Sequence, residues 1–193
     1  MMASIETKAT QQDKFNPRPV KFILWLFILS SIMLFAGVTS AYIVRQAEGN
    51  WKIFDLPPMF YYTTVIILLS SATMHWSFLQ SKKFNLKNQK IGLWITFLLG
   101  VVFLVGQYFG WKELVSNKVY FSGNPAESFV YVISGFHAVH IIAGLIIMLT
   151  AIIGVHSNIN QSKNVFRMEL SSIFWHFIDI LWIYLFVFLM INR

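Results

Sequence analysis

Cysteine is absent from this sequence of 193 residues. Neither disulfide bonds nor thiolate metal sites can therefore contribute to the structure, and a copper centre that needs bridging thiolates is excluded. Charged residues are also scarce, at 12% of the chain, where an ordinary soluble domain carries about a quarter. Hydrophobic residues make up 56% of the sequence and aromatic residues 17%. Most of the chain is therefore expected to face something other than water.

The few charges are clustered, and they leave five long apolar stretches between them. A membrane-spanning helix needs about 20 predominantly apolar residues, and each stretch is long enough. The expected spans are residues 22–44, 57–80, 91–111, 127–156 and 169–192. Runs of this length joined by short polar loops leave no amphipathic surface for water, which argues against a large soluble helical protein. We predict an all-α polytopic membrane protein in which residues 21–193 form a bundle of five transmembrane helices.

The segment before the first span is different in character. Residues 1–20 are mostly polar and include Pro17 and Pro19, which predicts a flexible tail. The first apolar stretch is longer than the 7 to 15 apolar residues of a secretory signal. We therefore expect it to be retained as a transmembrane helix.

The net charge of +7 is divided unevenly between the two sides of the expected membrane. Ten basic residues precede span one or join spans two to three and four to five: Lys8, Lys14, Arg18, Lys21, Lys82, Lys83, Lys87, Lys90, Lys163 and Arg167. Five lie on the other side: Arg45, Lys52, Lys112, Lys118 and Arg193. Because cytoplasmic loops are enriched in lysine and arginine, we predict a cytoplasmic N-terminus and a C-terminus outside. The membrane explains this charge pattern better than a nucleic-acid partner does.

Two of the expected helix starts carry local signals. Pro57 and Pro58 stand where the second span begins. Asn124, Pro125 and Glu127 have the order of an N-cap, an N1 proline and an N3 acid. Span four should therefore begin near residue 125.

Asp179 lies near the middle of the fifth span. An ionisable side chain at membrane depth is costly, so by default it faces the bundle interior and a partner. Glu169, Ser172, His176 and Asp179 follow one another at spacings of three, four and three residues, which places them on one helical face. We expect this polar stripe to hold spans four and five in register.

Polar side chains on two other spans fit the same packing role. His137 and His140 are three residues apart on span four, and Gly144 follows four residues later. Histidines beside a small residue predict a close helix contact with hydrogen bonds between helices. Gln107 adds a polar side chain to span three.

A metal site is the alternative interpretation of these residues. Histidines at positions i and i+3 can share one ion, and a carboxylate can complete its ligands. In this hypothesis His137, His140, His176 and Asp179 would make the chain an independent membrane metalloenzyme. Lewis-acid catalysis also needs an open coordination position and a general base beside a substrate pocket, and the sequence offers no further residue for these roles. Helix packing without a metal or heme is therefore the favoured interpretation.

Two motifs in this region resemble those of a known family, cytochrome c oxidase subunit III. Residues 174–182, FWHFIDILW, are preceded by Glu169 and are similar to the family's Tyr-Trp-His-Phe-Val-Asp-x-x-Trp run on its last helix. Residues 135–144, GFHAVHIIAG, match its Gly-Phe-His-x-x-His run on the preceding helix. The resemblance extends over residues 21–192. In its length the chain is similar to the short, five-helix bacterial form of the family.

The sequence departs from the family at two acidic positions. Ser31 stands where the first core helix of relatives has a membrane-embedded glutamate, and Gly110 stands where span three has another. The longer relatives also have two additional helices, which form one wall of a lipid-filled cleft. The resemblance does not carry over a role for either carboxylate or for the complete cleft.

The resemblance implies an accessory subunit of a heme-copper terminal oxidase. Such a subunit would bind no heme or copper itself, contact subunit I directly, assemble with subunit II and other respiratory subunits, and hold phospholipid at the subunit I interface. It would support proton uptake and protect the oxygen-reducing centre, while heme and copper in the partner subunits reduce dioxygen and pump protons. The short form and the lack of a transit-like leader favour a bacterial plasma membrane. The equivalent subunit of a quinol oxidase or nitric oxide reductase stays open, because nothing in the sequence identifies the electron donor.

Overall fold

The chain consists of five long helices in the computed structural model, which describes residues 18–49, 51–52, 56–157 and 160–192. The helices are α1 (Arg18–Ala47), α2 (Pro58–Lys82), α3 (Leu86–Ser116), α4 (Pro125–His156) and α5 (Gln161–Ile191). None of the described residues forms a strand, which confirms the prediction of an all-α protein. The predicted tail, residues 1–20, lies outside the described residues apart from its last three.

Four of the helices, α1, α3, α4 and α5, are long and apolar enough to cross a membrane. The second helix, α2, is less apolar because hydroxyl-bearing residues and a histidine recur along it: Thr63, Thr64, Ser70, Ser71, Thr73, His75 and Ser77. Many of these hydroxyls donate hydrogen bonds within the bundle, as Thr63 and Thr64 do to the carbonyl of Phe60.

The predicted helix starts are confirmed. Asn124 Oδ1 accepts from the backbone N–H of Ala126 at 3.1 Å, and Glu127 Oε2 accepts from the backbone N–H of Asn124 at 3.4 Å. With Pro125 in the first turn, these contacts make a capping box at the start of α4. Pro57 is the N-cap of α2, and Pro58 follows it in the first turn.

The helices are longer than the apolar stretches in the sequence. The fifth helix begins at Gln161, eight residues before the predicted span, and the third ends at Ser116, five residues beyond it. Charged side chains are costly at the bilayer centre but not at a helix end that reaches the interface. The helical backbone therefore continues through Lys163 and Arg167.

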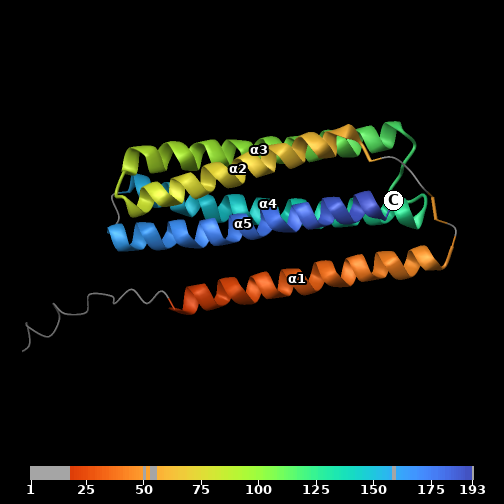
Figure 1. Ribbon diagram of the computed structural model, residues 1–193, viewed down its shortest axis with the longest axis horizontal. Coiled ribbons are helices and arrows are strands. Elements are labelled where there is room, and N and C mark those ends of the chain that lie inside the picture. The colour runs from red at the N-terminus through yellow and green to blue at the C-terminus, as the bar shows by residue number, and fades with distance from the viewer. Residues whose placement is uncertain (1–17, 50, 53–55, 158–159, 193) are drawn as a thin grey trace, which may run out of the picture.

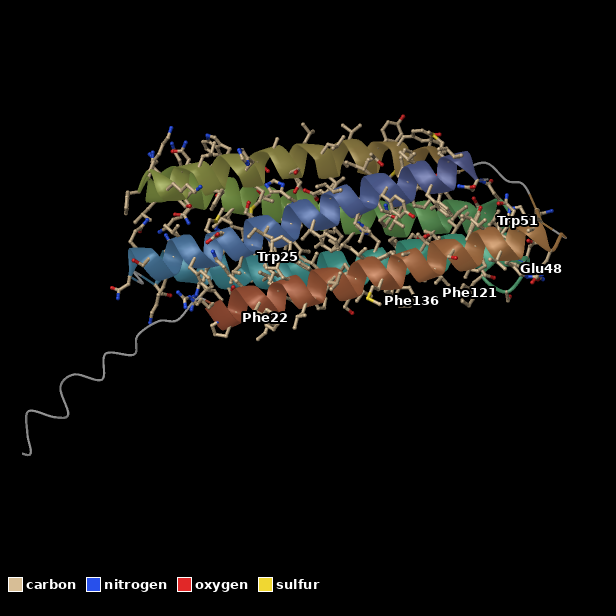
Figure 2. The ribbon with its side chains drawn as sticks, turned by 60° about the horizontal axis from the view of Figure 1, so that its bottom comes forward. Phe22, Trp25, Glu48, Trp51, Phe121 and Phe136 are labelled. Carbon is tan, nitrogen blue, oxygen red and sulfur yellow. The ribbon has the colours of Figure 1, made fainter. Side chains whose placement is uncertain are left out.

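Helices α2, α3, α4 and α5 form a closed ring in which each packs against the next and α5 returns to α2. Helix α1 lies outside this ring, alongside α4 and α5 only (Figure 1). It buries six residues along one face, among them Phe35 and Tyr42. Phe22 and Trp25 are exposed apolar side chains near its start, while Glu48 and Trp51 lie at the far end of the bundle (Figure 2).

Candidate functional site

Trp175 lies at the centre of the four-helix ring and contacts three other helices. Its indole Nε1 donates to Ser70 Oγ of α2 at 3.0 Å. A Cβ built on Gly100 of α3 would come within 2.6 Å of the indole ring, and one built on Gly144 of α4 within 3.2 Å. The two glycines therefore allow α3 and α4 to approach this ring more closely than any other residue would.

His176 follows Trp175 and reaches α2. Its Nδ1 lies 2.8 Å from Ser71 Oγ, and its ring centroid is 5.9 Å from that of His75. His75 is exposed on α2, whereas His176 is half-buried. The sequence had led us to expect a polar contact of this histidine with α4. In the structure its contact is with α2 instead.

Asp179 is almost completely buried, with 2% of its surface exposed. Neither carboxyl oxygen has a hydrogen-bond partner among the described residues. Ser71 is the polar side chain that interacts with it, but the pair lacks hydrogen-bond geometry. Asp179 therefore shares Ser71 as a neighbour with His176, on the seam between α2 and α5.

His137 is fully buried on α4 and lies among aromatic rings. Its ring centroid is 4.8 Å from that of Trp182 on α5, and it meets Phe103 of α3 in an edge-on arrangement at 5.7 Å. Neither ring nitrogen has a hydrogen-bond partner among the described residues. His137 thus contributes to α4–α5 packing through its ring.

His140 points away from His137 and connects α4 to α1. Its Nδ1 is 2.7 Å from the carbonyl of Phe136, and its Nε2 is 3.0 Å from Ser31 Oγ. Because a carbonyl only accepts, Nδ1 carries a proton. The Ser31 hydroxyl, whose Oγ is also 2.8 Å from the carbonyl of Phe27, has a single proton to share between that carbonyl and Nε2. The residue at the family's missing carboxylate position is therefore part of the polar contact between α1 and α4.

Glu169 also connects to α1 and not to α4. Lys21 Nζ donates to its Oε1 at 2.7 Å. Tyr42 OH and Gln46 Nε2 donate to the carbonyl of Asn192 at 2.9 and 3.1 Å near the other end of α1. Together with the Ser31–His140 contact, these bonds attach α1 to the ring near its start, at its middle and near its end.

The two remaining predicted positions lie on α3. Gln107 Nε2 donates to Thr63 Oγ1 of α2 at 3.1 Å. A Cβ on Gly110 would meet the ring of Phe60 at 3.7 Å, an ordinary van der Waals distance. Both positions therefore take part in the α2–α3 interface.

The four candidate metal ligands do not converge. His140 faces α1, His137 lies among aromatic rings, and His176 faces α2. Within the part of the chain that the structure describes, no group of three or more histidine, cysteine, aspartate or glutamate side chains is placed to hold a metal ion. This arrangement does not fit the membrane metalloenzyme hypothesis.

Sequence reasoning missed two further polar contacts between distant segments. Gln89 of α3 and Asn164 of α5 exchange two amide hydrogen bonds of 3.2 Å while both are buried. Lys52 Nζ donates at 2.7 Å to the buried Glu127. Both amides lie beside the basic loops, where polar residues are normally solvated, so no sequence signal distinguished them.

Comparison with known proteins gives a consistent family assignment. The family model of cytochrome c oxidase subunit III matches residues 3–192. The cytochrome c oxidase subunit 3 of Bacillus sp. (strain PS3) is 30% identical, over 95% of this chain and 89% of that protein. Subunit 3 of the cytochrome bo(3) ubiquinol oxidase is 31% identical in Buchnera aphidicola, over 89% of this chain and 93% of the relative. The Pseudomonas aeruginosa protein of the same name is 33% identical, over 86% of this chain and 81% of the relative.

Proposed function

The chain belongs to the cytochrome c oxidase subunit III family, and we propose that it is the accessory subunit III of a respiratory heme-copper oxidase that reduces dioxygen to water and pumps protons. The family match over residues 3–192 carries this proposal. The geometry supports it, because several residues of the two sequence motifs lie inside the helix packing. Trp175, Trp182 and His137 are all buried there.

In this proposal the chain contributes no part of the electron path. Heme and copper belong to the partner subunits I and II, and subunit I is the direct neighbour. The histidines of this chain are engaged in helix contacts, His140 with Ser31 and His176 with Ser71. Their role is to fix the positions of helices, and the assembled bundle in turn supports subunit I and its proton uptake.

Phospholipid is the second proposed component of the interface. Two apolar grooves run beside α1, where it lies against α4 and α5. One is lined by residues that include Ile23, Phe27 and Ile146, and the other by residues that include Phe35 and Tyr184. Grooves of this composition suit acyl chains, and they would let lipid fill the space between this chain and subunit I.

The membrane arrangement is part of the same proposal. We propose that α2 is the fifth transmembrane helix despite its polar residues, because it is a full member of the ring. The N-terminus would be cytoplasmic, the C-terminus outside, and the membrane a bacterial plasma membrane. The start of α1 and the end of α5 lie at opposite ends of the bundle (Figure 1), as an odd number of spans requires.

A ubiquinol oxidase is the second candidate for the complex. Relatives that carry this name are 31% and 33% identical to the chain, as similar as the 30% identical cytochrome c oxidase subunit. The chain would have the same supporting role in either complex, since the electron donor binds elsewhere.

The decisive experiment is to tag the full chain and isolate it from its own membranes in a mild detergent. We expect larger subunits with heme and copper to copurify, and the two donors, reduced cytochrome c and ubiquinol, to be distinguished by turnover assays. Removal of this chain should leave the heme spectrum nearly unchanged while activity decays during turnover. A stoichiometric heme or transition metal in the separated chain would contradict the proposal.

A further inference from the structure

The α2–α3 turn, residues 82–90, is a strongly basic segment that takes little part in the helix packing, although Lys82 Nζ lies 4.3 Å from the centroid of the Phe78 ring on its own helix. It contains Lys82, Lys83, Lys87 and Lys90, and no acidic residue occurs anywhere between Asp55 and Glu113. Lys82, Lys83 and Lys87 are exposed, and Lys90 is half-buried. Lys87 and Lys90 share one face of α3 because they are three residues apart.

These lysines have no carboxylate partner among the described residues. The ion pairs there involve Lys21, Arg45 and Lys52. The turn lies at the end of the bundle where α4 ends and α5 begins (Figure 1). Glu169 is the described carboxylate nearest this end along α5, and its Oε1 already accepts from Lys21 at 2.7 Å. The positive charge of the turn is therefore not neutralised by the described part of the chain.

The turn also exposes two apolar side chains between its lysines. Phe84 is 70% exposed and Leu86 is 40% exposed. Phe84 ends α2 with a φ of +57°, in a position where helices normally use glycine. The N–H of Asn85 bonds to the carbonyl of Gln80, and that of Phe84 to the carbonyl of Ser81, which is the hydrogen-bond pattern of a Schellman motif. A bulky residue is disfavoured in this conformation, and most of the Phe84 side chain is exposed instead of packed in the bundle.

The turn is held in a fixed position. Gln161 Nε2 donates to the carbonyl of Ser81, and the Gln89–Asn164 amide pair fastens the start of α3 to α5. Exposed lysines around an exposed aromatic ring are thus presented on a rigid support at a helix end, where a bilayer surface would lie.

We propose that the α2–α3 turn binds anionic phospholipid headgroups at the membrane surface. The lysine ammonium groups contact the phosphates, and Phe84 and Leu86 enter the boundary between headgroups and acyl chains. Clustered lysines next to a transmembrane helix attract anionic lipids, and an aromatic side chain at this depth adds apolar contact. This site is separate from the apolar grooves beside α1, which lie between helices.

The absence of cysteine from the sequence allows a site-specific test on the full chain with its copurifying subunits. A fluorophore is attached to a single cysteine at Asn85, in the turn, or at Asn117, at the other end of α3. The protein is reconstituted in phosphatidylcholine vesicles that contain either brominated phosphatidylglycerol or brominated phosphatidylcholine. At Asn85 we expect the anionic quencher to act at about a tenfold lower mole fraction than the neutral one, and at Asn117 we expect no preference.

Matched variants identify the contributing side chains. The preference at Asn85 should be lost in K83Q/K87Q and should persist in K112Q/K118Q, which removes two exposed lysines at the opposite end. Phe84→Gly should weaken the preference while leaving thermal stability equal or higher, because glycine suits a φ of +57°. Lys118→Gly relieves the other non-glycine residue with a positive φ in the described part of the chain, where φ is +62°, and should leave the preference unchanged.

Two outcomes would overturn the proposal. The first is an undiminished preference in K83Q/K87Q; if that variant also releases a partner subunit, the turn is a protein contact. The second is equal competition by soluble glycerol phosphate, which would indicate a site for free phosphate and not for a lipid surface.

Discussion

Trp175 is the single side chain on which most of the helix packing converges. It is 1% exposed, it donates to Ser70, and the glycines at positions 100 and 144 leave space for its ring. In a membrane, close packing at small residues replaces much of the hydrophobic effect as the force between helices. The fit around this indole should therefore contribute more to stability than any one hydrogen bond in the bundle.

Gly100→Ala tests this directly. The added methyl group would lie 2.6 Å from the indole ring, so the ring or α3 must move, and overpacking of this kind costs about 1 to 3 kcal/mol. Ser70→Ala removes the indole's hydrogen bond and the long, 3.5 Å bond from Ser70 Oγ to the carbonyl of Thr96, and each should contribute about 0.6 kcal/mol, the average for such contacts in membranes. Thermal unfolding of the purified full chain in detergent measures both changes.

Gly135→Ala is the matched control, because nothing lies within 4 Å of a Cβ built at that position. Alanine favours a helix over glycine by about 1 kcal/mol, so this variant should be neutral or stabilising. Equal effects of the two glycine variants would show that the space around Trp175 is not limiting.

The sequence predicted which of these residues are polar and share a helical face, but not which helix they meet. The spacing of His176 and Asp179 correctly placed both on one side of α5. Their neighbour Ser71 lies on α2, 105 residues from His176 in the chain. The rotation of each helix about its axis depends on all its neighbours at once, and no local pattern encodes it. For this reason the connection of Glu169 to Lys21, and of His140 to Ser31, could not be derived in advance.

At the scale of elements, the start of α4 is the most heavily constrained helix end. The carboxylate of Glu127 accepts from Lys52 Nζ and from the backbone N–H groups of Tyr120 and Asn124. Its side chain is 3% exposed, whereas that of Lys52 is 51% exposed. The local capping signal was readable in the sequence because it spans only four residues. The contact with Lys52 was not readable, because this lysine lies in a loop 75 residues away from Glu127 in the chain.

Because Glu127 is buried and Lys52 is exposed, substitutions of the two residues should differ in how much they destabilise the fold. Lys52→Gln leaves a buried carboxylate without its cation, whereas Glu127→Gln leaves a lysine that water can solvate. We therefore expect Lys52→Gln to be the more destabilising, and the double variant to recover part of the loss. Hydrogen exchange at the amides of Tyr120 and Asn124 should accelerate in the same order. Arg45→Gln is the control, because its exposed pair with Glu48 should contribute under about 1 kcal/mol.

The whole molecule separates its basic residues between two ends. Of the ten residues predicted to be cytoplasmic, the eight described ones belong to the start of α1, the α2–α3 turn and the first turns of α5, which meet at one end (Figure 1). Lys8, Lys14 and Arg193 lie outside the described residues. The fold thus gathers these basic residues at one end of the bundle, which is the uneven distribution from which the orientation was predicted.

Cysteine accessibility in intact cells checks this orientation. A cysteine at Asn85 should be protected from a membrane-impermeant thiol reagent, and a cysteine at Ser122 should be labelled. Both positions are exposed, and the chain has no other cysteine. Permeabilised cells, in which both should react, provide the control. Labelling of Asn85 but not Ser122 in intact cells would reverse the assigned orientation.

The attachment of α1 has a consequence for biosynthesis. The first helix is synthesised long before its partners exist, because its bonds reach His140, Glu169 and Asn192. The ring of α2 to α5, by contrast, begins to form as soon as the α2–α3 hairpin is complete. In the order of synthesis α1 comes first, but its contacts can form only in steps: with His140 once α4 has been made, with Glu169 once α5 has been made, and with the carbonyl of Asn192 only when the ribosome has added that residue.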